Sequence, residues 1–320
     1  MGLPARKPLT FVNLHGHCTF SFADGFGTPA EHVLRAAELG YTALALTEHG
    51  NVSSHFQLEK HALAAGIVPI FGLEAYTGSV DEDTREQYKY HLTLLARTDA
   101  GYRNLNLLVS QSWRDYYYHP TVGSNNLVGH SAGLACLSGC TGSLLACTLV
   151  GGKGLPENTD TSGHIVPNYN GAYDIIQWFL SIFGEHYYLE VQPFWELEKT
   201  STINPAYELL SRETGVPLVV THDVHYPRPE DSEMQAILHA VHRGKHSVDD
   251  ALRSWNYEVS MTFPESDNDL YYKLRKTGLS RDAAVDAIEN SARIAAGCRV
   301  TLPKAERLRY PISEEDFKPW

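Results

Sequence analysis

The sequence lacks long apolar runs, a disulfide framework and a surplus of positive charge. No apolar run approaches the roughly 20 residues that a membrane-spanning helix needs, and the N-terminal segment has no signal-peptide core. The five cysteines are odd in number and form no C-x-x-C pair, which argues against paired disulfides and for a reducing compartment. These features predict a cytoplasmic protein with no membrane partner.

The charge balance also excludes one class of protein. The chain has 26 basic and 38 acidic residues, a net charge of −12 at pH 7. Such a protein does not coat nucleic acid through its whole surface, although bound cations can attract phosphate at one site. The 320 residues and the hydrophobic content of 43% suit one large globular domain, or one domain with an appendage. Sixteen histidines are the unusual feature.

Short apolar runs alternate with amphipathic segments along the chain. The runs are TFVNL, YTALALT, GIVPIFG, HLTLLAR, GLACLSG, YYLEVQ and VPLVV. Repeated β–α units predict a parallel sheet, and about seven of them predict closure into a barrel. Helices are expected at residues 29–39, 53–65, 104–111, 172–183, 204–214 and 282–298, the first of them opened by a T-P-A-E capping box.

Ligands of such a barrel gather where the strands end. Five runs are followed directly by residue types that bind metals. These residues are His15 and His17 after the first run, Glu48 and His49 after the second, Glu74 after the third, Cys140 after the fifth, and His222, Asp223 and His225 after the last. His15 and His17 stand two residues apart in extended chain, so both side chains should point the same way. The sequence therefore predicts a metal site at one mouth of the barrel.

Several motifs, taken in order, resemble those of the PHP (polymerase and histidinol phosphatase) domain family. They are LHGHCTFSFADG, ALTEHGN, PIFGLEAY, HLTLLARTDAGYRNL, CLSGC and VVTHDVHYPRPED, between about residues 10 and 245. The form in question is the one at the N-terminus of the bacterial DNA polymerase III alpha subunit. The resemblance implies an α/β fold, a distorted (β/α)7 barrel over residues 1–265. A small C-terminal helical extension and tail, residues 266–320, is expected to pack on the barrel.

The same resemblance implies a site for three divalent ions of manganese, zinc or iron. Carried over residue by residue, it names nine metal ligands: His15, His17, Asp24, His49, Glu74, His91, Cys140, Asp223 and His225. Glu74 would bridge two ions. The first ion is also held by His15, His17 and Asp223, the second by His91 and Cys140, and the third by Asp24, His49 and His225. The single thiolate favours zinc, and the carboxylates leave manganese open.

Clustered divalent ions suit the hydrolysis of phosphate esters, because they lower the pKa of bound water and neutralise charge on the phosphate oxygens. We expect the catalytic residues to be Glu74, Asp223, His49 and His225, with His49 or His225 near the leaving group. The resemblance favours a 3′–5′ exonuclease acting on DNA. One alternative is a phosphomonoesterase for a phosphorylated small molecule or a DNA 3′-phosphate. Another is a non-catalytic, metal-stabilised scaffold that docks to a separate replicative polymerase.

The chain departs from the family pattern in four places, one of which is the loop at 151–168, longer than the family pattern. Glu48 stands where the family usually has Asp, and its extra methylene shifts a hydrogen bond behind the ligands. His222 stands where the polymerase subunits usually have Asn. The chain ends at Trp320, where the polymerase palm would begin, so we expect a free-standing domain that does not polymerise DNA by itself.

Two further segments each allow two interpretations. The histidines of ILHAVHRGKH, at positions 239, 242 and 246, fall near one helical face and could bind metal, but solvated histidines are the preferred interpretation. The segment SWRDYYYHP, residues 112–120, either stacks a nucleotide base through Tyr116–Tyr118 or packs as a loop against the barrel.

Overall fold

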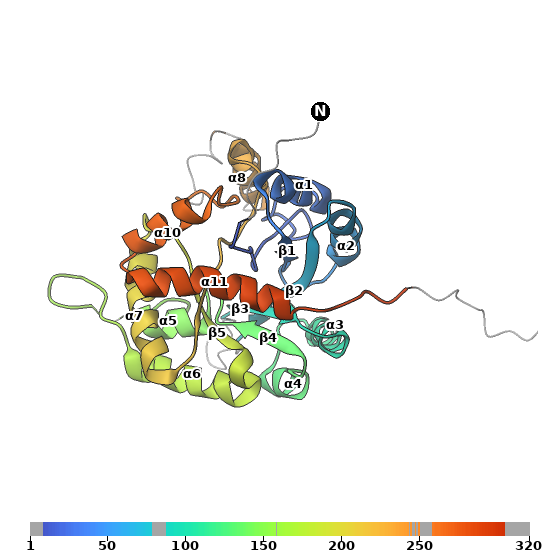
Figure 1. Ribbon diagram of the computed structural model, residues 1–320. Helices are drawn as coiled ribbons and strands as arrows, with labels where there is room; N and C mark the ends of the chain where they lie inside the picture. Colours follow the sequence, from blue (N-terminus) through green and yellow to red (C-terminus); the bar gives the residue numbers. More distant parts are fainter. Residues whose placement is uncertain are drawn as a thin grey trace, which may run out of the picture.

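One curled, mixed sheet organises the molecule (Figure 1). The computed structural model describes residues 9–78, 88–157, 159–242 and 258–304, together with residues 244, 247 and 249. The strands follow one another in the sheet in chain order. They are β1 (Ala43–Leu46), β2 (Val68–Thr77), β3 (Tyr90–Ala96), β4 (Leu134–Leu137), β5 (Tyr187–Val191) and β6 (Leu218–Val220).

The direction of β3 corrects the expectation of a parallel sheet. This strand pairs antiparallel with both β2 and β4, whereas the other neighbouring pairs are parallel. Between Thr77 and Tyr90 the sequence is the polar segment GSVDEDTREQYK, which has no amphipathic pattern for the crossover helix that parallel pairing needs. Because of the reversal, the beginning of β3 lies at the same edge as the carboxyl ends of the parallel strands.

The first apolar run also differs from the expectation, because it forms no regular strand among the described residues. Instead, Asn13 makes an isolated parallel bridge to Leu44 of β1, and Gly16 makes another to Val224, just beyond β6. The segment therefore lies between the two outer strands of the curled sheet, β1 and β6, and connects them by single bridges. The Gly16 N–H donates to Thr47 Oγ1, which holds this segment beside the end of β1.

Helices pack around the sheet, and the first agrees with its predicted bounds. In α1 (Pro29–Leu39) the Thr28 hydroxyl accepts from the Glu31 N–H and the Glu31 carboxylate accepts from the Thr28 N–H, which is the expected capping box. The other α-helices are α2 (His55–Ala64), α3 (Asp99–Arg114), α4 (Ser124–Gly129), α5 (Leu144–Val150), α6 (Tyr169–Phe183), α7 (Glu198–Thr214), α8 (Ser232–His242), α10 (Asp267–Lys276) and α11 (Arg281–Gly297). Two 3-10 helices, η1 (Gly184–His186) and η2 (Pro229–Asp231), complete the elements. Within the described part of the chain, none of the helices has the length and apolar character to cross a membrane.

Helix α11 covers the end of the sheet opposite the predicted ligands, and Figure 1 shows it crossing in front of the strands. Its Ile294 and Ala295, with Cys298 just beyond the helix, belong to one buried cluster with side chains from β1, β2, β3, β4 and β6, and Tyr188 of β5 packs against that cluster. The strand members include Ala43 at the start of β1 and Leu95 near the end of β3, and they extend along β4 from Ala135 to Leu137. The sheet therefore has an apolar closed end and, at the other end, the edge that carries the polar residues.

Candidate metal centre

The structure brings all nine predicted ligand residues together at one edge of the sheet. They come from the bridging segment (His15, His17), from loops (Asp24, His49), from β2 (Glu74), from the start of β3 (His91) and from the chain after β4 and β6 (Cys140, Asp223, His225). Glu74 is a small correction, since it lies within β2 and not after the end of its strand. The reversal of β3 explains why His91, near the start of its strand, reaches the same edge as the rest.

The first group surrounds the carboxylates of Glu74 and Asp223. His15 Nε2 lies 3.4 Å from Glu74 Oε1 and 3.4 Å from Asp223 Oδ1. His17 Nε2 lies 3.4 Å from Glu74 Oε2 and 3.5 Å from Asp223 Oδ1. All four side chains are buried. These separations exceed the length of a good hydrogen bond and leave a space bordered by nitrogen and oxygen atoms that can bind a metal.

Several atoms that border this space make no hydrogen bond to any described residue. They are His15 Nε2, His17 Nε2 and Asp223 Oδ1, whereas His49 Nδ1 and Glu74 Oε2 lie 2.5 Å from each other and form an ion pair. Buried polar atoms without partners are costly and rare in folded proteins. A cation among them would satisfy nitrogen lone pairs and carboxylate oxygens together, so the residues present fit divalent metal ions.

The second group combines a carboxylate, an imidazole and a thiol. His91 Nδ1 lies 2.8 Å from Glu74 Oε1. Cys140 Sγ lies 3.4 Å from His91 Nδ1 and 3.7 Å from Glu74 Oε1. Burial and the nearby Glu74 carboxylate raise the pKa of the Cys140 thiol well above its usual value in the absence of a cation. The Glu74 carboxylate thus faces both the first and the second group, as the bridging role requires.

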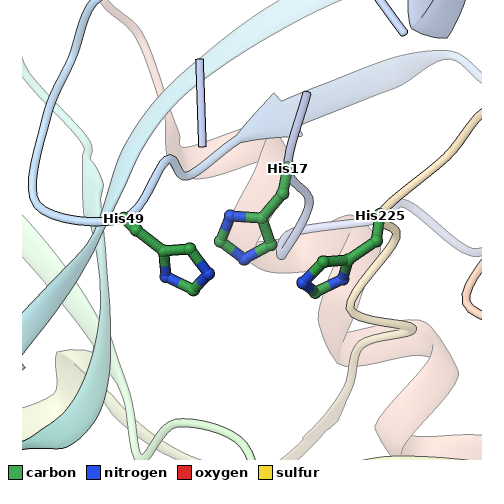
Figure 2. Close-up of side chains that lie close together, drawn as sticks. All are labelled: His17, His49 and His225. Carbon is green, nitrogen blue, oxygen red and sulfur yellow. The ribbon is translucent and has the colours of Figure 1, made fainter. Parts of the chain in front are cut away.

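The third group lies on the solvent side of the first. His49 Nε2 is 2.8 Å from Asp24 Oδ2, and His225 Nε2 is 3.5 Å from the same oxygen. Figure 2 shows the rings of His17, His49 and His225 side by side. The His17 ring centre lies 4.2 Å from that of His49 and 4.6 Å from that of His225. His17 therefore stands between the first and third groups and not within the first alone.

The electrostatics of the cluster keep its two central carboxylates charged. Burial alone would raise the pKa of Glu74, but the neighbouring His91, His49 and His15 hold it well below its usual value. Asp223 is held low in the same way, with burial opposed by His15 and His225. Burial, together with His49 and His225, lowers the pKa of His17 to about 3, so its ring is neutral with a lone pair to donate.

Polar residues behind the ligands fix two of the imidazoles. His15 Nδ1 lies 2.7 Å from Glu190 Oε1, and Glu190 accepts hydrogen bonds from the hydroxyls of Thr93 and Thr221. Sequence reasoning missed Glu190, although a buried acidic residue inside the apolar run YYLEVQ was the available signal.

The second imidazole is fixed through the position where the sequence departs from the family pattern. His17 Nδ1 lies 2.8 Å from Ser21 Oγ, and Ser21 Oγ donates to Glu48 Oε2. Glu48 is fully buried and also accepts from the Cys18 backbone N–H and thiol. Glu48 thus acts on His17 through Ser21, which agrees with the expected place of this residue behind the ligands.

One histidine corrects the sequence interpretation of α8. His239 is buried, and its Nε2 lies 2.6 Å from Asp24 Oδ1, so the preferred interpretation of a solvated side chain was wrong for this residue. His242 is exposed, as expected, and His246 lies outside the described residues. His239 holds Asp24 from the side opposite His49.

A cavity of about 230 Å³ lies over the cluster. Its lining includes most of the nine residues, with Gln192 and Lys153 at its border. Lys153 Nζ donates to the backbone oxygens of Lys89 and Gly142, each at 2.8 Å, which keeps an ammonium group beside the donor atoms. The site therefore has room for a small anionic group next to the cluster.

Known proteins resemble this chain in sequence. The DNA polymerase III subunit alpha of Borreliella burgdorferi is 31% identical over 315 residues, a match that covers 95% of this chain and 25% of the relative. The same subunit of Treponema pallidum is 32% identical over 312 residues, covering 92% and 24%. The chain thus spans about a quarter of the length of these curated relatives. In fold comparison, a histidinol phosphate phosphatase from Lactococcus lactis, solved with zinc, L-histidinol and phosphate, aligns with a TM-score of 0.39 at 16% identity over 74% of this chain and 95% of that one.

A domain family also matches the chain directly. Residues 13–193 match the PHP domain, which is more than half of the 320 residues. The matched stretch includes seven of the nine clustered side chains, from His15 to Cys140. The chain therefore belongs to the PHP domain family.

Proposed function

We propose that this protein is a metal-dependent phosphoesterase whose nine clustered residues hold up to three divalent ions of zinc, manganese or iron. The observation that carries the proposal is the group of three buried atoms beside Glu74, namely His15 Nε2, His17 Nε2 and Asp223 Oδ1, that make no hydrogen bond to any described residue. Bound divalent ions supply Lewis-acid activation of water and neutralise charge on a phosphate. A purely structural ion would need fewer ligands than nine.

Individual residues of the chain have separate roles in the proposed reaction. Glu74 and Asp223 supply the carboxylates, and Glu190 keeps His15 Nε2 directed at both of them. We propose that His49 and His225 border the leaving group, because both line the cavity over the cluster. Lys153, fixed by two backbone oxygens at the edge of the cavity, is suited to attract a phosphate into it.

For the substrate, we propose DNA and a 3′–5′ exonuclease reaction. The relatives described above are DNA polymerase subunits by name, and the cavity adjoins a wider cleft that shares Asp24 and His49 with it. An open approach of this kind suits a polymer better than a small phosphomonoester. A replicative polymerase is the partner that such an activity would serve.

The test compares three substrates with zinc or manganese added. They are single-stranded DNA labelled at its 5′ end, the same strand carrying a 3′-phosphate, and p-nitrophenyl phosphate. Stepwise shortening from the 3′ end is the expected result. Phosphate release without shortening would indicate a phosphomonoesterase, and metal binding without any hydrolysis would indicate a scaffold.

Matched variants tie the activity to the cluster. Asp223→Ala or His17→Ala should abolish hydrolysis while circular dichroism stays unchanged. Asp174→Ala, an exposed aspartate on α6, is the control and should retain full activity. Equal activity of Asp223→Ala and Asp174→Ala would refute the proposed site.

We also propose the division into a barrel, residues 1–265, and an extension, residues 266–320. The extension supports the barrel in two ways: α11 fills its apolar end, and Asp267 accepts from the N–H groups of Thr10 and Phe11. Residues 305–320 of the expected tail lie outside the described residues.

A further inference from the structure

A second and wider cleft, of about 430 Å³, adjoins the metal cavity. The two share Asp24 and His49, so the cleft opens directly at the third group of donor atoms. Aromatic rings dominate its lining: Phe20, Phe22, Tyr76, Trp113, Tyr116 and Tyr118. A concentration of rings beside a polar cluster has no role in the hydrolysis itself and calls for its own explanation.

Four of these rings face solvent, whereas Tyr76 is buried and Phe20 packs against the core of the barrel. Phe22 is 88% exposed, Tyr118 is 68% exposed, and Trp113 and Tyr116 are each 52% exposed. Of the two interpretations of residues 112–120, packing as a loop therefore does not describe these side chains. Apolar surface of this kind, gathered in one cleft, is typical of a binding face.

Two of the rings form a flat platform with a fixed position. Trp113 and Tyr116 stack with their ring centres 5.4 Å apart and their planes at 12°. Trp113 Nε1 donates to the Gly50 carbonyl at 2.8 Å, directly after His49 in the chain. The indole is therefore held beside the metal cluster, with Tyr116 as the next ring outward.

A positive charge accompanies the rings. Lys89 lines the same cleft, and its Nζ lies 4.6 Å from the centre of the Tyr76 ring. Tyr76 in turn stacks with His49, with ring centres 5.6 Å apart and planes at 16°. In a chain with a net charge of −12, a cation in this position stands out as an attraction for phosphate.

We propose that this cleft binds the unpaired end of a single-stranded nucleic acid, whose bases stack on the Trp113, Tyr116 and Tyr118 rings. Lys89 pairs with a backbone phosphate, and the neighbouring phosphodiester enters the metal cavity. Base faces stack on aromatic rings without regard to sequence, whereas paired bases have their faces covered and small phosphate esters have none. This inference rests on the proposed function and names the form of its substrate: an unpaired strand end.

The test measures binding apart from hydrolysis. A fluorescent hexamer of thymidine with phosphorothioate linkages, which resist hydrolysis, is titrated with the full chain, as purified and after EDTA treatment. An abasic hexamer of the same charge is the matched ligand. The thymidine hexamer should bind roughly tenfold tighter, because stacking on aromatic rings contributes at about this level per base.

Variants separate stacking from charge. Tyr116→Ala should weaken thymidine binding roughly tenfold and leave abasic binding unchanged, while Tyr116→Phe keeps the ring and the affinity. Lys89→Gln should weaken both ligands alike. Tyr272→Ala, which removes a ring 65% exposed on α10, is the control and should change neither.

The outcomes distinguish this inference from the function on which it rests. Equal affinities for the two hexamers, or full thymidine affinity in Tyr116→Ala, would overturn the stacking cleft even if the protein hydrolyses DNA. Base-dependent binding that Tyr116→Ala removes, in a protein without any hydrolytic activity, would leave the cleft in place and overturn the phosphoesterase.

Discussion

Glu190 Oε1 lies 2.7 Å from His15 Nδ1, on the side of the imidazole opposite Glu74 and Asp223. A carboxylate in this position holds the Nδ1 proton and orients the ring so that Nε2 is directed at the cluster. Thr93 and Thr221 donate to the same carboxylate, so Glu190 itself is fixed. Glu190 is therefore a positioning residue for His15 and does not border the cavity over His15.

The first prediction concerns this contact. Glu190→Gln keeps the shape of the side chain but removes its charge, and it should weaken zinc or manganese binding by about tenfold or more. Calorimetric titration of the metal-stripped protein measures the effect. Glu185→Gln, at a carboxylate side chain that is 87% exposed two residues before β5, should bind metal like the wild type. Unchanged affinity in Glu190→Gln would show that His15 needs no carboxylate behind it.

The sequence predicted those site residues that stand next to an apolar run and missed one that lies inside a run. His15, His17, Asp223 and His225 stand next to apolar runs, and that position alone marks the edge at which they meet. Glu190 was missed because it lies inside its run and acts through His15, and spacing along the chain does not reveal such a contact. The role of the nine residues as metal ligands stays a prediction, although their proximity is now established.

The sequence predicted the fold in outline, but it did not predict two features, and each has a physical reason. An apolar run has no direction, so HLTLLAR gave no sign that β3 is antiparallel to its neighbours. The run TFVNL has the composition of a strand, but its chain makes only single bridges on its way to His15 and His17. Local patterns predicted α1 well because its capping box lies entirely within the helix start.

The second prediction concerns the choice of metal. Cys140 is the one sulfur among the nine clustered residues, and thiolate favours zinc over manganese. Cys140→Ser should therefore lower the preference for zinc over manganese by about tenfold, or about 1.4 kcal/mol. Competition between the two ions, followed by elemental analysis, measures the ratio. Cys147→Ser, at a buried cysteine of α5, is the control, and an equal ratio in both variants would exclude Cys140 as a ligand.

The third prediction concerns stability and pH, through two histidines away from the cluster. Burial lowers the pKa of His32 and of His55 to about 4, only partly offset by their contacts with the Phe26 and Gly72 carbonyls. The unfolded chain has an ordinary histidine pKa of about 6.5 and binds more protons between these values. The contribution of these two histidines to the free energy of unfolding should therefore be fully present above about pH 6.5 and should be lost as the pH drops toward 4.

His55→Gln tests this relation, because glutamine retains a donor for the Gly72 carbonyl but does not titrate. Between pH 6 and 4.5 its free energy of unfolding should depend less steeply on pH, by up to about 1.4 kcal/mol per pH unit. The measurement is denaturant titration in excess EDTA, which removes metal ions from both proteins, so that the clustered histidines titrate alike in each. His164→Gln, with a side chain 74% exposed, should keep the wild-type slope. A wild-type slope in His55→Gln would mean that His55 is protonated in the folded protein.

The last prediction concerns the extension. Ile294 of α11 is 5% exposed and belongs to the buried cluster that includes Val12, Ala45 and Leu137. Ile294→Ala leaves a cavity there and should lower the free energy of unfolding by about 2–5 kcal/mol in denaturant titration. Val285→Ala, on the same helix but 39% exposed, should cost clearly less. Equal effects of the two substitutions would mean that α11 does not support the barrel, because only Ile294 contacts residues of the strands' apolar end.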